Sequence, residues 1–213
     1  IRFHDVSFRY GEDGPWVLDG INLEIPAGSS LGVVGGTGSG KSTLLDVFMG
    51  LLTPQKGSVT VDGEALTGKR CRAWQGALAH VPQHVYLADT TIAGNIAFGI
   101  GKEQIDVERV AAAARQARLD EFIRSRAGGY DAYVGERGVR LSGGQRQRLG
   151  IARALYRSAR VLVLDEATSA LDAVTESEVI DAIEAADRST TVVIVAHRVA
   201  TIRYCDMIVE LSD

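Results

Sequence analysis

The sequence LGVVGGTGSGKSTLLDVFMGL, residues 31–51, decides the fold of this chain. It begins with a short apolar run, Leu31 to Val34, and passes through a glycine-rich loop into apolar residues at helical spacing. The loop fits the pattern G-x-x-x-x-G-K-[ST], which cradles phosphate where it joins a strand to a helix. We expect the phosphate contacts to come from Gly35, Gly36, Thr37, Gly38, Ser39, Gly40, Lys41, Ser42 and Thr43.

The residue types of this loop suit a polyphosphate. Glycines let the backbone wrap closely around phosphate oxygens, so that successive N–H groups point at them. The helix that follows adds the positive end of its dipole. Lys41 supplies a point charge for β- and γ-phosphates, and the Ser42 hydroxyl is a hard oxygen ligand for Mg²⁺. A merely flexible Gly-Ser loop is the alternative, and the strand and helix patterns on either side argue against it.

The rest of the chain alternates between strand and helix patterns. Apolar residues at period two within 1–10 and 21–25 predict antiparallel strands with one buried face. Helical spacing dominates from about residue 90 to about residue 156. Later runs rich in β-branched residues are typical of strands covered by helices on both faces. These runs are Val161–Leu164, Thr191–Val195 and Met207–Leu211.

These patterns predict one α/β domain over residues 1–213. We expect a P-loop NTPase core with a mostly parallel sheet, an N-terminal antiparallel β subdomain and an inserted helical subdomain. The core would take about residues 1–83 and 159–213, and the helical subdomain about residues 84–158.

The run Val161–Leu164 ends in two carboxylates, Asp165 and Glu166. In open parallel sheets the ligand lies beyond the carboxyl ends of the strands, so both acids are expected at the phosphate site. Asp165 would hold Mg²⁺, and Glu166 would orient and polarise an attacking water, a role whose loss costs about 10²- to 10⁴-fold in rate. Taken without the loop, the two acids could equally be solubilising turn residues.

Charge and hydropathy narrow the range of partners. The net charge of −4 at pH 7 gives no reason to expect a nucleic-acid partner, because such domains usually carry a basic face. The apolar runs are far shorter than the roughly 20 residues that cross a bilayer. The chain starts at Ile1, already inside a strand-like pattern, and we expect it to be part of a longer polypeptide.

A second motif indicates which family of phosphate-binding proteins the chain resembles. Residues 141–145 read LSGGQ, and Ser142, Gly143, Gly144 and Gln145 precede a helical run. The motif reproduces the signature of ABC (ATP-binding cassette) ATPases, and the chain resembles that family from Tyr10 to His197. The serine and glycines open a helix and so offer a second anion-binding end. The resemblance implies that two copies pack head to tail, with the signature of one closing over ATP held by the other. A simple helix-capping turn is the alternative.

The resemblance also implies roles for four further residues. Tyr10 resembles the aromatic residue that stacks on adenine, and Gln83 resembles the glutamine that reaches Mg²⁺ and the attacking water. Asp172, in the segment 169–172, resembles part of the loop that communicates across the dimer. His197 resembles the histidine that contacts the γ-phosphate.

Two segments are similar to those of exporters rather than importers, namely residues 91–96 and 134–138. The resemblance therefore implies a Mg²⁺-dependent ATPase that powers an exporter from the cytoplasmic face of a membrane, with transmembrane domains on the same polypeptide. Two alternatives stay open: a soluble ABC ATPase that acts on DNA or ribosomes, and a nucleotide-binding switch without hydrolysis. Glu166 and His197 argue against the switch, since degenerate cassettes commonly lose one of them.

Overall fold

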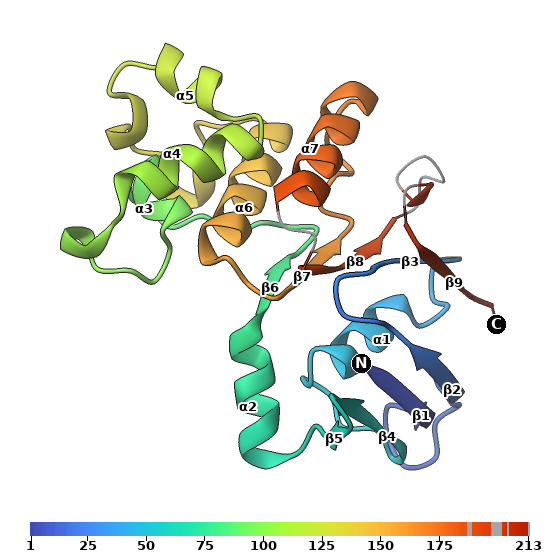
Figure 1. The fold of residues 1–213 in the computed structure, drawn as a ribbon. Coiled ribbons are helices and arrows are strands. Elements are labelled where there is room, and N and C mark those ends of the chain that lie inside the picture. The colour runs from blue at the N-terminus through green and yellow to red at the C-terminus, as the bar shows by residue number, and fades with distance from the viewer. Residues whose placement is uncertain (187–188, 197–201, 204, 213) are drawn as a thin grey trace. The chain divides into compact units, whose positions relative to one another are not determined.

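A computed structural model describes residues 1–186, 189–196, 202–203 and 205–212 of the chain (Figure 1). The chain forms two compact units. The first unit comprises Ile1–Leu78 and Ser189–Asp213, and the second comprises Ala79–Arg188. Each unit is described by itself below.

The first unit contains an antiparallel sheet with the strand order β2-β1-β4-β5. Its strands are β1 (Arg2–Phe8), β2 (Leu18–Glu24), β4 (Lys56–Val61) and β5 (Glu64–Ala65). In β1 the buried apolar positions change from odd to even numbers between Phe3 and Val6, where the pairing with β2 shifts register. Asp5 adopts a φ of 45° at this point, as in a β-bulge that keeps both halves of the strand facing the core. The predicted antiparallel β subdomain is confirmed.

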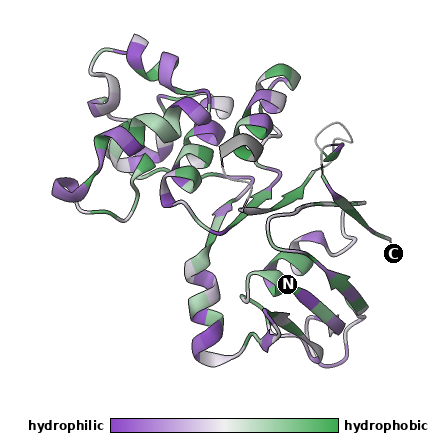
Figure 2. Ribbon diagram, in the orientation of Figure 1, coloured by the Kyte–Doolittle hydropathy of each residue, from purple (hydrophilic) through white to green (hydrophobic). Residues whose placement is uncertain are grey.

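Three parallel strands form the other sheet region of the first unit. β3 (Ser30–Gly35) pairs on one side with β8 (Thr191–Val195) and on the other with β9 (Met207–Leu211). Every residue of β8 is buried, and Figure 2 colours most of this strand as hydrophobic. The described part of the unit also contains the helices α1 (Lys41–Phe48) and α2 (Gly68–Ala77). Trp74 of α2 is buried against Phe48 of α1, and its indole N–H donates to the Phe48 carbonyl at 2.7 Å.

The second unit is mainly helical. β6 (Leu78–Val81) leads into it and lies beside β7 (Val161–Asp165). The long helix α6 (Gly143–Arg157) packs against α3 (Ile92–Ile96) and α4 (Val107–Gln116), and α4 also contacts α5 (Asp120–Ser125) and α7 (Ala173–Ala186). Short 3₁₀ turns cover η1 (Lys102–Gln104), η2 (Gly129–Asp131) and η3 (Glu136–Gly138). In the described part of the chain, none of the helices has the length and apolar character needed to cross a membrane.

The architecture confirms the predicted α/β class, with parallel strands, a separate antiparallel sheet and a helical region. The residue boundaries given above for the core and the helical subdomain stay a prediction.

Candidate functional site

The glycine-rich loop joins β3 to α1, the context that its sequence pattern requires. Lys41 is the first residue of α1 and is buried; its ammonium donates to the carbonyls of Gly35 at 2.9 Å and Gly36 at 2.7 Å. Gly40 has a φ of +91°, and a Cβ there would lie 2.9 Å from the carbonyl oxygen of Val17. This position therefore requires glycine for both its conformation and its space.

Two hydroxyl groups of the loop differ in their surroundings. The Ser39 Oγ is buried, and among the described residues it has no hydrogen-bond partner. A buried polar atom without a partner costs free energy, so a phosphate oxygen would be a fitting acceptor for it. Ser42, in the first turn of α1, is exposed.

Tyr10 lies in the same unit as the loop and is 59% exposed. Its ring packs edge-on against Phe8, and its hydroxyl hydrogen-bonds with the Thr43 Oγ1 at 3.2 Å. The first unit thus brings Tyr10 to α1, the helix that begins with Lys41. An exposed aromatic face at this place is compatible with the predicted stacking on a base.

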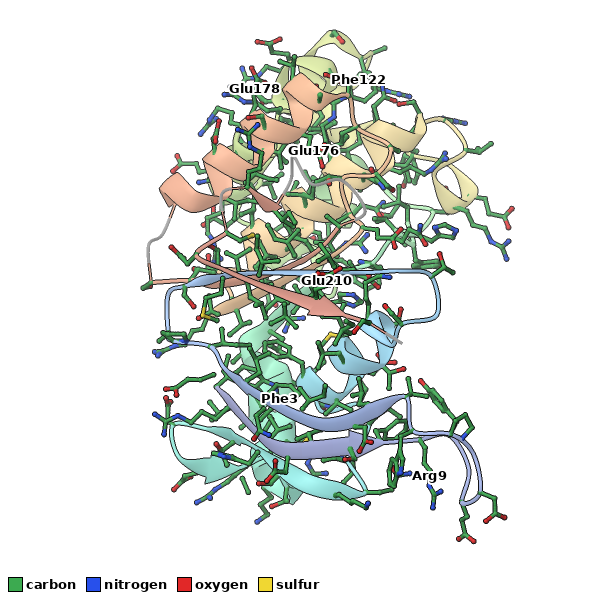
Figure 3. The ribbon with its side chains drawn as sticks, turned by 90° about the vertical axis from the view of Figure 1, so that its right-hand side faces the viewer. Phe3, Arg9, Phe122, Glu176, Glu178 and Glu210 are labelled. Carbon is green, nitrogen blue, oxygen red and sulfur yellow. The ribbon has the colours of Figure 1, made fainter. Side chains whose placement is uncertain are left out.

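The ring of Trp16 contacts two cations. The Arg9 guanidinium is 4.6 Å from the centre of the ring and the Lys56 ammonium is 4.5 Å from it. Figure 3 labels Arg9 at one end of the antiparallel sheet. These contacts fix the segment on either side of Tyr10, and the sequence did not decide the role of Trp16.

In the second unit, Gln83 meets Glu166. The Gln83 Nε2 donates to the Glu166 Oε2 at 2.6 Å, although the two residues are 83 positions apart. Asp165 is the last residue of β7, and Glu166 follows it with a φ of +50°, a left-handed conformation that is uncommon outside glycine. Two of the residues predicted to act on the attacking water are therefore in direct contact.

The signature motif begins α6. Ser142 is the N-cap of the helix, and a capping box links it to Gln145: the Ser142 Oγ accepts from the Gln145 N–H at 3.3 Å, and the Gln145 Oε1 accepts from the Ser142 N–H at 2.8 Å. A Cβ on Gly144 would lie 3.2 Å from the Ala170 carbonyl oxygen, whereas one on Gly143 would only reach ordinary contact with the Ala170 side chain. The motif is thus a capped helix start pressed against the segment after Glu166.

Asp172 precedes α7 and accepts two hydrogen bonds from Thr175, one from its N–H at 3.0 Å and one from its hydroxyl at 2.7 Å. These hydrogen bonds, the backbone one first, lower the pKa of the Asp172 carboxyl below its ordinary value. Asp172 is therefore a charged helix cap in this structure. His197 lies outside the described residues.

The two segments that resemble exporters lie side by side in the second unit. Thr91 forms a β-bridge with Tyr133, the Ile92 N–H donates to the Ala132 carbonyl at 2.9 Å, and the Val134 N–H donates to the Thr90 carbonyl at 3.1 Å. Tyr133 is exposed. The sequence suggested these segments separately, and their contact could not be read from it.

A buried asparagine and an arginine connect the first of these segments, residues 91–96, to α6. Asn95 is 0% exposed, and its side chain hydrogen-bonds with the N–H and the carbonyl of Ala88. Arg153 of α6 donates to the Asn95 carbonyl at 2.9 Å and to the Tyr86 carbonyl at 2.9 Å, and it stacks on Phe98. Burial lowers the pKa of Arg153, which nevertheless stays charged. Asn95 belongs to the predicted exporter-like segment 91–96, whereas Arg153 was not among the predicted site residues.

Comparison with known proteins identifies the family. Residues 18–169 match the family model described as ABC transporter. This chain belongs to the ABC transporter family. Two ABC transporter relatives named ATP-dependent lipid A-core flippase are similar over the whole chain: one from Chromohalobacter salexigens is 46% identical over 213 residues, and one from Alkalilimnicola ehrlichii is 44% identical over 212 residues.

Similarity to a solved ABC transporter extends to the fold. A bacterial Atm1-family ABC exporter with ATP bound has a TM-score of 0.92 and 37% sequence identity, over 99% of this chain. The present chain spans 36% of the length of that exporter and 36% of the length of each of the two flippases. It therefore corresponds to one part of these longer ABC transporters.

Proposed function

We propose that this chain binds and hydrolyses ATP as the nucleotide-binding domain of an ABC exporter. The observation that carries the proposal is the hydrogen bond of 2.6 Å between Gln83 and Glu166 at the end of a buried strand. A carboxylate held by an amide in this place suits a general base that orients water. The family match and the similar exporter solved with ATP bound support the assignment.

ATP is proposed to bind with its phosphates on the glycine-rich loop. Lys41 and the N-terminal end of α1 supply positive charge, and the buried hydroxyl of Ser39 supplies a hydrogen bond. Tyr10 would stack on the adenine, a contact worth about 1–3 kcal/mol where bases stack on aromatic side chains.

In the proposed reaction, the oxygen of a water molecule attacks the γ-phosphorus in line. The bond between that phosphorus and the oxygen bridging it to the β-phosphate breaks, ADP leaves with the electron pair, and inorganic phosphate is the second product. Glu166 accepts the proton that the water loses, while Gln83 fixes the orientation of the carboxylate. His197 is proposed to contact the γ-phosphate. Positioning and charge stabilisation account for most of the catalysis in such a reaction.

The residues present fit Mg²⁺. Ser42, Asp165 and the amide oxygen of Gln83 are hard oxygen donors, the ligands that Mg²⁺ prefers. The Gln83 Nε2 is engaged with Glu166, so its amide oxygen is the atom for a metal ion. The ion, when bound, would neutralise phosphate charge. We therefore propose a Mg²⁺-dependent ATPase.

A second copy of the chain is proposed to complete each site head to tail. In the capping box the Ser142 Oγ acts as an acceptor, so its own hydrogen can donate to a phosphate oxygen of the facing copy. The dipole of α6 adds positive charge at the same end of the helix. A two-fold dimer then forms two equal sites from one sequence.

The names and lengths of the relatives support a membrane partner. These longer proteins are named as flippases and as an exporter, and this chain matches about a third of each. We propose that transmembrane domains of the same polypeptide use the closing and reopening of the dimer at the cytoplasmic face of a membrane. The contact between the segments around Thr91 and Tyr133 supports an exporter-type surface for this coupling.

Substituting Glu166 with glutamine tests the proposal. The amide keeps the size of the side chain but cannot accept the proton of the water, so Glu166→Gln should bind ATP and Mg²⁺ while its turnover falls by about 10²- to 10⁴-fold. The trapped nucleotide should produce an ATP-dependent dimer in size-exclusion chromatography. A variant that hydrolyses ATP at the wild-type rate would show that Glu166 is not the base.

A further inference from the structure

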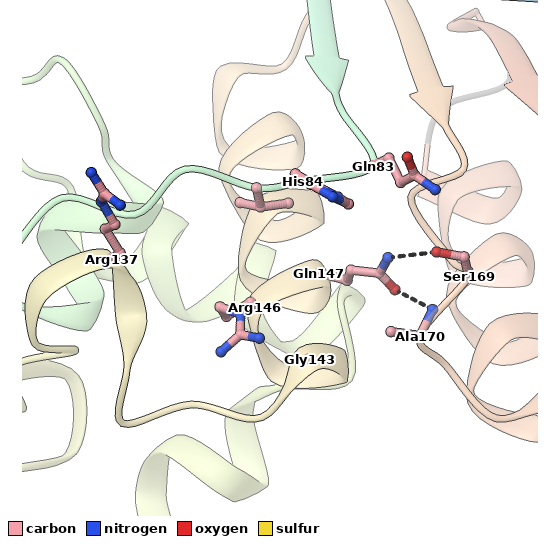
Figure 4. A pocket seen from close by; sticks show the side chains of 9 residues that line it. Gln83, His84, Arg137, Gly143, Arg146, Gln147, Ser169 and Ala170 are labelled. Atoms are coloured by element: carbon pink, nitrogen blue, oxygen red, sulfur yellow. Dashed lines mark hydrogen bonds between the residues drawn. The ribbon is translucent and has the colours of Figure 1, made fainter.

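Gln147 lies in the first turns of α6 and is buried, with 5% of its surface exposed. Its side chain points at the segment that follows β7 rather than at solvent (Figure 4). The Nε2 donates to the Ser169 Oγ at 3.0 Å, and the Oε1 accepts from the Ala170 N–H at 2.8 Å. The Nε2 also lies 3.5 Å from the Glu166 carbonyl oxygen, which it approaches as a weaker donor. One amide side chain thus contacts three residues of a single loop.

This loop begins in an unfavourable backbone conformation. Glu166 has a φ of +50°, a left-handed conformation that is unfavourable for a residue with a Cβ. A turn follows it, in which the Ser169 N–H donates to the Glu166 carbonyl at 3.1 Å. A conformation of this kind persists only where the surroundings hold it. The contacts of Gln147 lie on that same turn.

The middle of the loop is held from a different helix. The Thr168 hydroxyl donates to the Glu176 Oε1 of α7 at 2.6 Å, and both residues are buried; Glu176 is labelled on α7 in Figure 3. The close approach of Gly144 to the Ala170 carbonyl oxygen lets α6 lie directly against the loop. From α6, Gln147 therefore bonds to the turn on both sides of Thr168, while Glu176 of α7 bonds to Thr168 itself.

We infer that Gln147 is a positioning residue for ATP hydrolysis: it holds the turn 166–170 so that the Glu166 carboxylate keeps its place beside Gln83. The inference rests on the proposed hydrolysis. Gln147 acts on the backbone of the turn and Gln83 on the Glu166 carboxylate, so the two glutamines restrain Glu166 at different atoms.

The expected effect falls on the rate of the chemical step. Gln147 belongs to the second unit, and the glycine-rich loop with Lys41 belongs to the first. Loss of the Gln147 amide therefore leaves the predicted phosphate contacts of Lys41 intact. A displacement of a catalytic group by about 1 Å costs up to about 10²-fold in rate. We expect a lower kcat with an unchanged Kd for ATP.

The test compares Gln147→Met with a matched change at Gln116. Methionine has nearly the shape of glutamine and suits a helix, but it lacks the amide. Gln116→Met makes the same change at the C-terminal end of α4 in the second unit, and among the described residues no hydrogen bond joins Gln116 to the turn 166–170. ATP hydrolysis and ATP binding are measured for the full chain, together with the thermal midpoint. Gln147→Met should lower kcat by about 10- to 100-fold and leave Kd within about twofold, while Gln116→Met matches the wild type.

A second variant covers the case in which Gln147→Met fails to fold or to bind ATP. Ser169 is exposed and loses only its hydroxyl in Ser169→Ala, which should lower kcat by a smaller factor with Kd unchanged. A wild-type kcat in a folded Gln147→Met variant overturns the positioning role. If Gln147→Met does not fold, a wild-type kcat in Ser169→Ala overturns it instead. A wild-type chain that does not hydrolyse ATP overturns the proposed function as well, so the two failures are distinguishable.

Discussion

Replacing Asn95 with alanine should destabilise the segment that joins β6 to α3. The Asn95 side chain makes four hydrogen bonds, to the N–H and the carbonyl of Ala88, to the Thr91 carbonyl and to the Arg153 Nη2. Because Asn95 is fully buried, water cannot replace these partners without a rearrangement.

The size of the destabilisation depends on which hydrogen bonds the partners of Asn95 retain after the substitution. The Ala88 carbonyl still accepts from the Thr90 N–H at 2.8 Å, and the Thr91 carbonyl still accepts from the Asn95 N–H at 3.0 Å. The partly buried Ala88 N–H and Arg153 Nη2 both lose the Asn95 oxygen as acceptor, and a buried donor without a partner costs about 1–3 kcal/mol. With the weaker losses added, the free energy of unfolding should fall by about 2–4 kcal/mol. For a chain of this length that corresponds to a drop of about 5–15 °C in Tm.

Thermal unfolding of Asn95→Ala and Asn22→Ala measures this effect against a matched control. Asn22 is the other asparagine of the sequence; it is exposed and bonds to Asp5. Its replacement should cost no more than about 0.5–1 kcal/mol. Amide hydrogen exchange should also be faster at Ala88 in Asn95→Ala. Equal shifts in Tm for the two variants would refute the reasoning.

Two further variants probe the first unit. Lys41→Ala should weaken ATP binding greatly, because the loop loses its point charge; an unchanged Kd in calorimetry would contradict the phosphate assignment. The Ser30 N–H, followed by its hydroxyl, lowers the pKa of the Asp206 carboxyl. The stabilisation is thus complete above the ordinary aspartate pKa of about 3.9 and is lost as the pH falls below it. In Asp206→Asn the free energy of unfolding should therefore fall less steeply than in the wild type as the pH drops below about 3.9. The same pH dependence in both proteins would show that Asp206 does not contribute to acid unfolding.

The elements with strong local patterns were predictable from sequence. The glycine-rich loop follows from residues that are contiguous in sequence, and the buried strand β8 follows from its unbroken run of β-branched residues. The signature was predictable as a helix start because Ser142 and Gln145 form a capping box within four residues. In each case the decisive interactions are local or arise from burial on both faces.

Other elements were not predicted from the sequence, for physical reasons that the structure shows. Helix α2 buries only Trp74, so it carries little apolar periodicity. The β4–β5 hairpin does carry a local signal, Asp62-Gly63, whose residues take φ values of 51° and 80°, and the sequence analysis overlooked it.

The arrangement around Glu166 could not have been read from the sequence. Its φ is positive, its carbonyl is contacted by Gln147, which is 19 residues away, and its carboxylate is contacted by Gln83, which is 83 residues away. A glutamine within a helix has no periodic or spacing signature. Such contacts exist only once β7 and α6 pack together.

Mixing two inactive variants tests the shared active site most directly. Lys41→Ala removes from the glycine-rich loop the positive charge that is predicted to contact the phosphates. Ser142→Asp keeps a good helix cap for α6 but turns a negative charge towards the phosphates. If each site combines the loop of one copy with the signature of the other, a mixed dimer contains one intact site. An equimolar mixture should then recover about a quarter of the wild-type ATPase rate. A mixture as inactive as its two components would contradict the account.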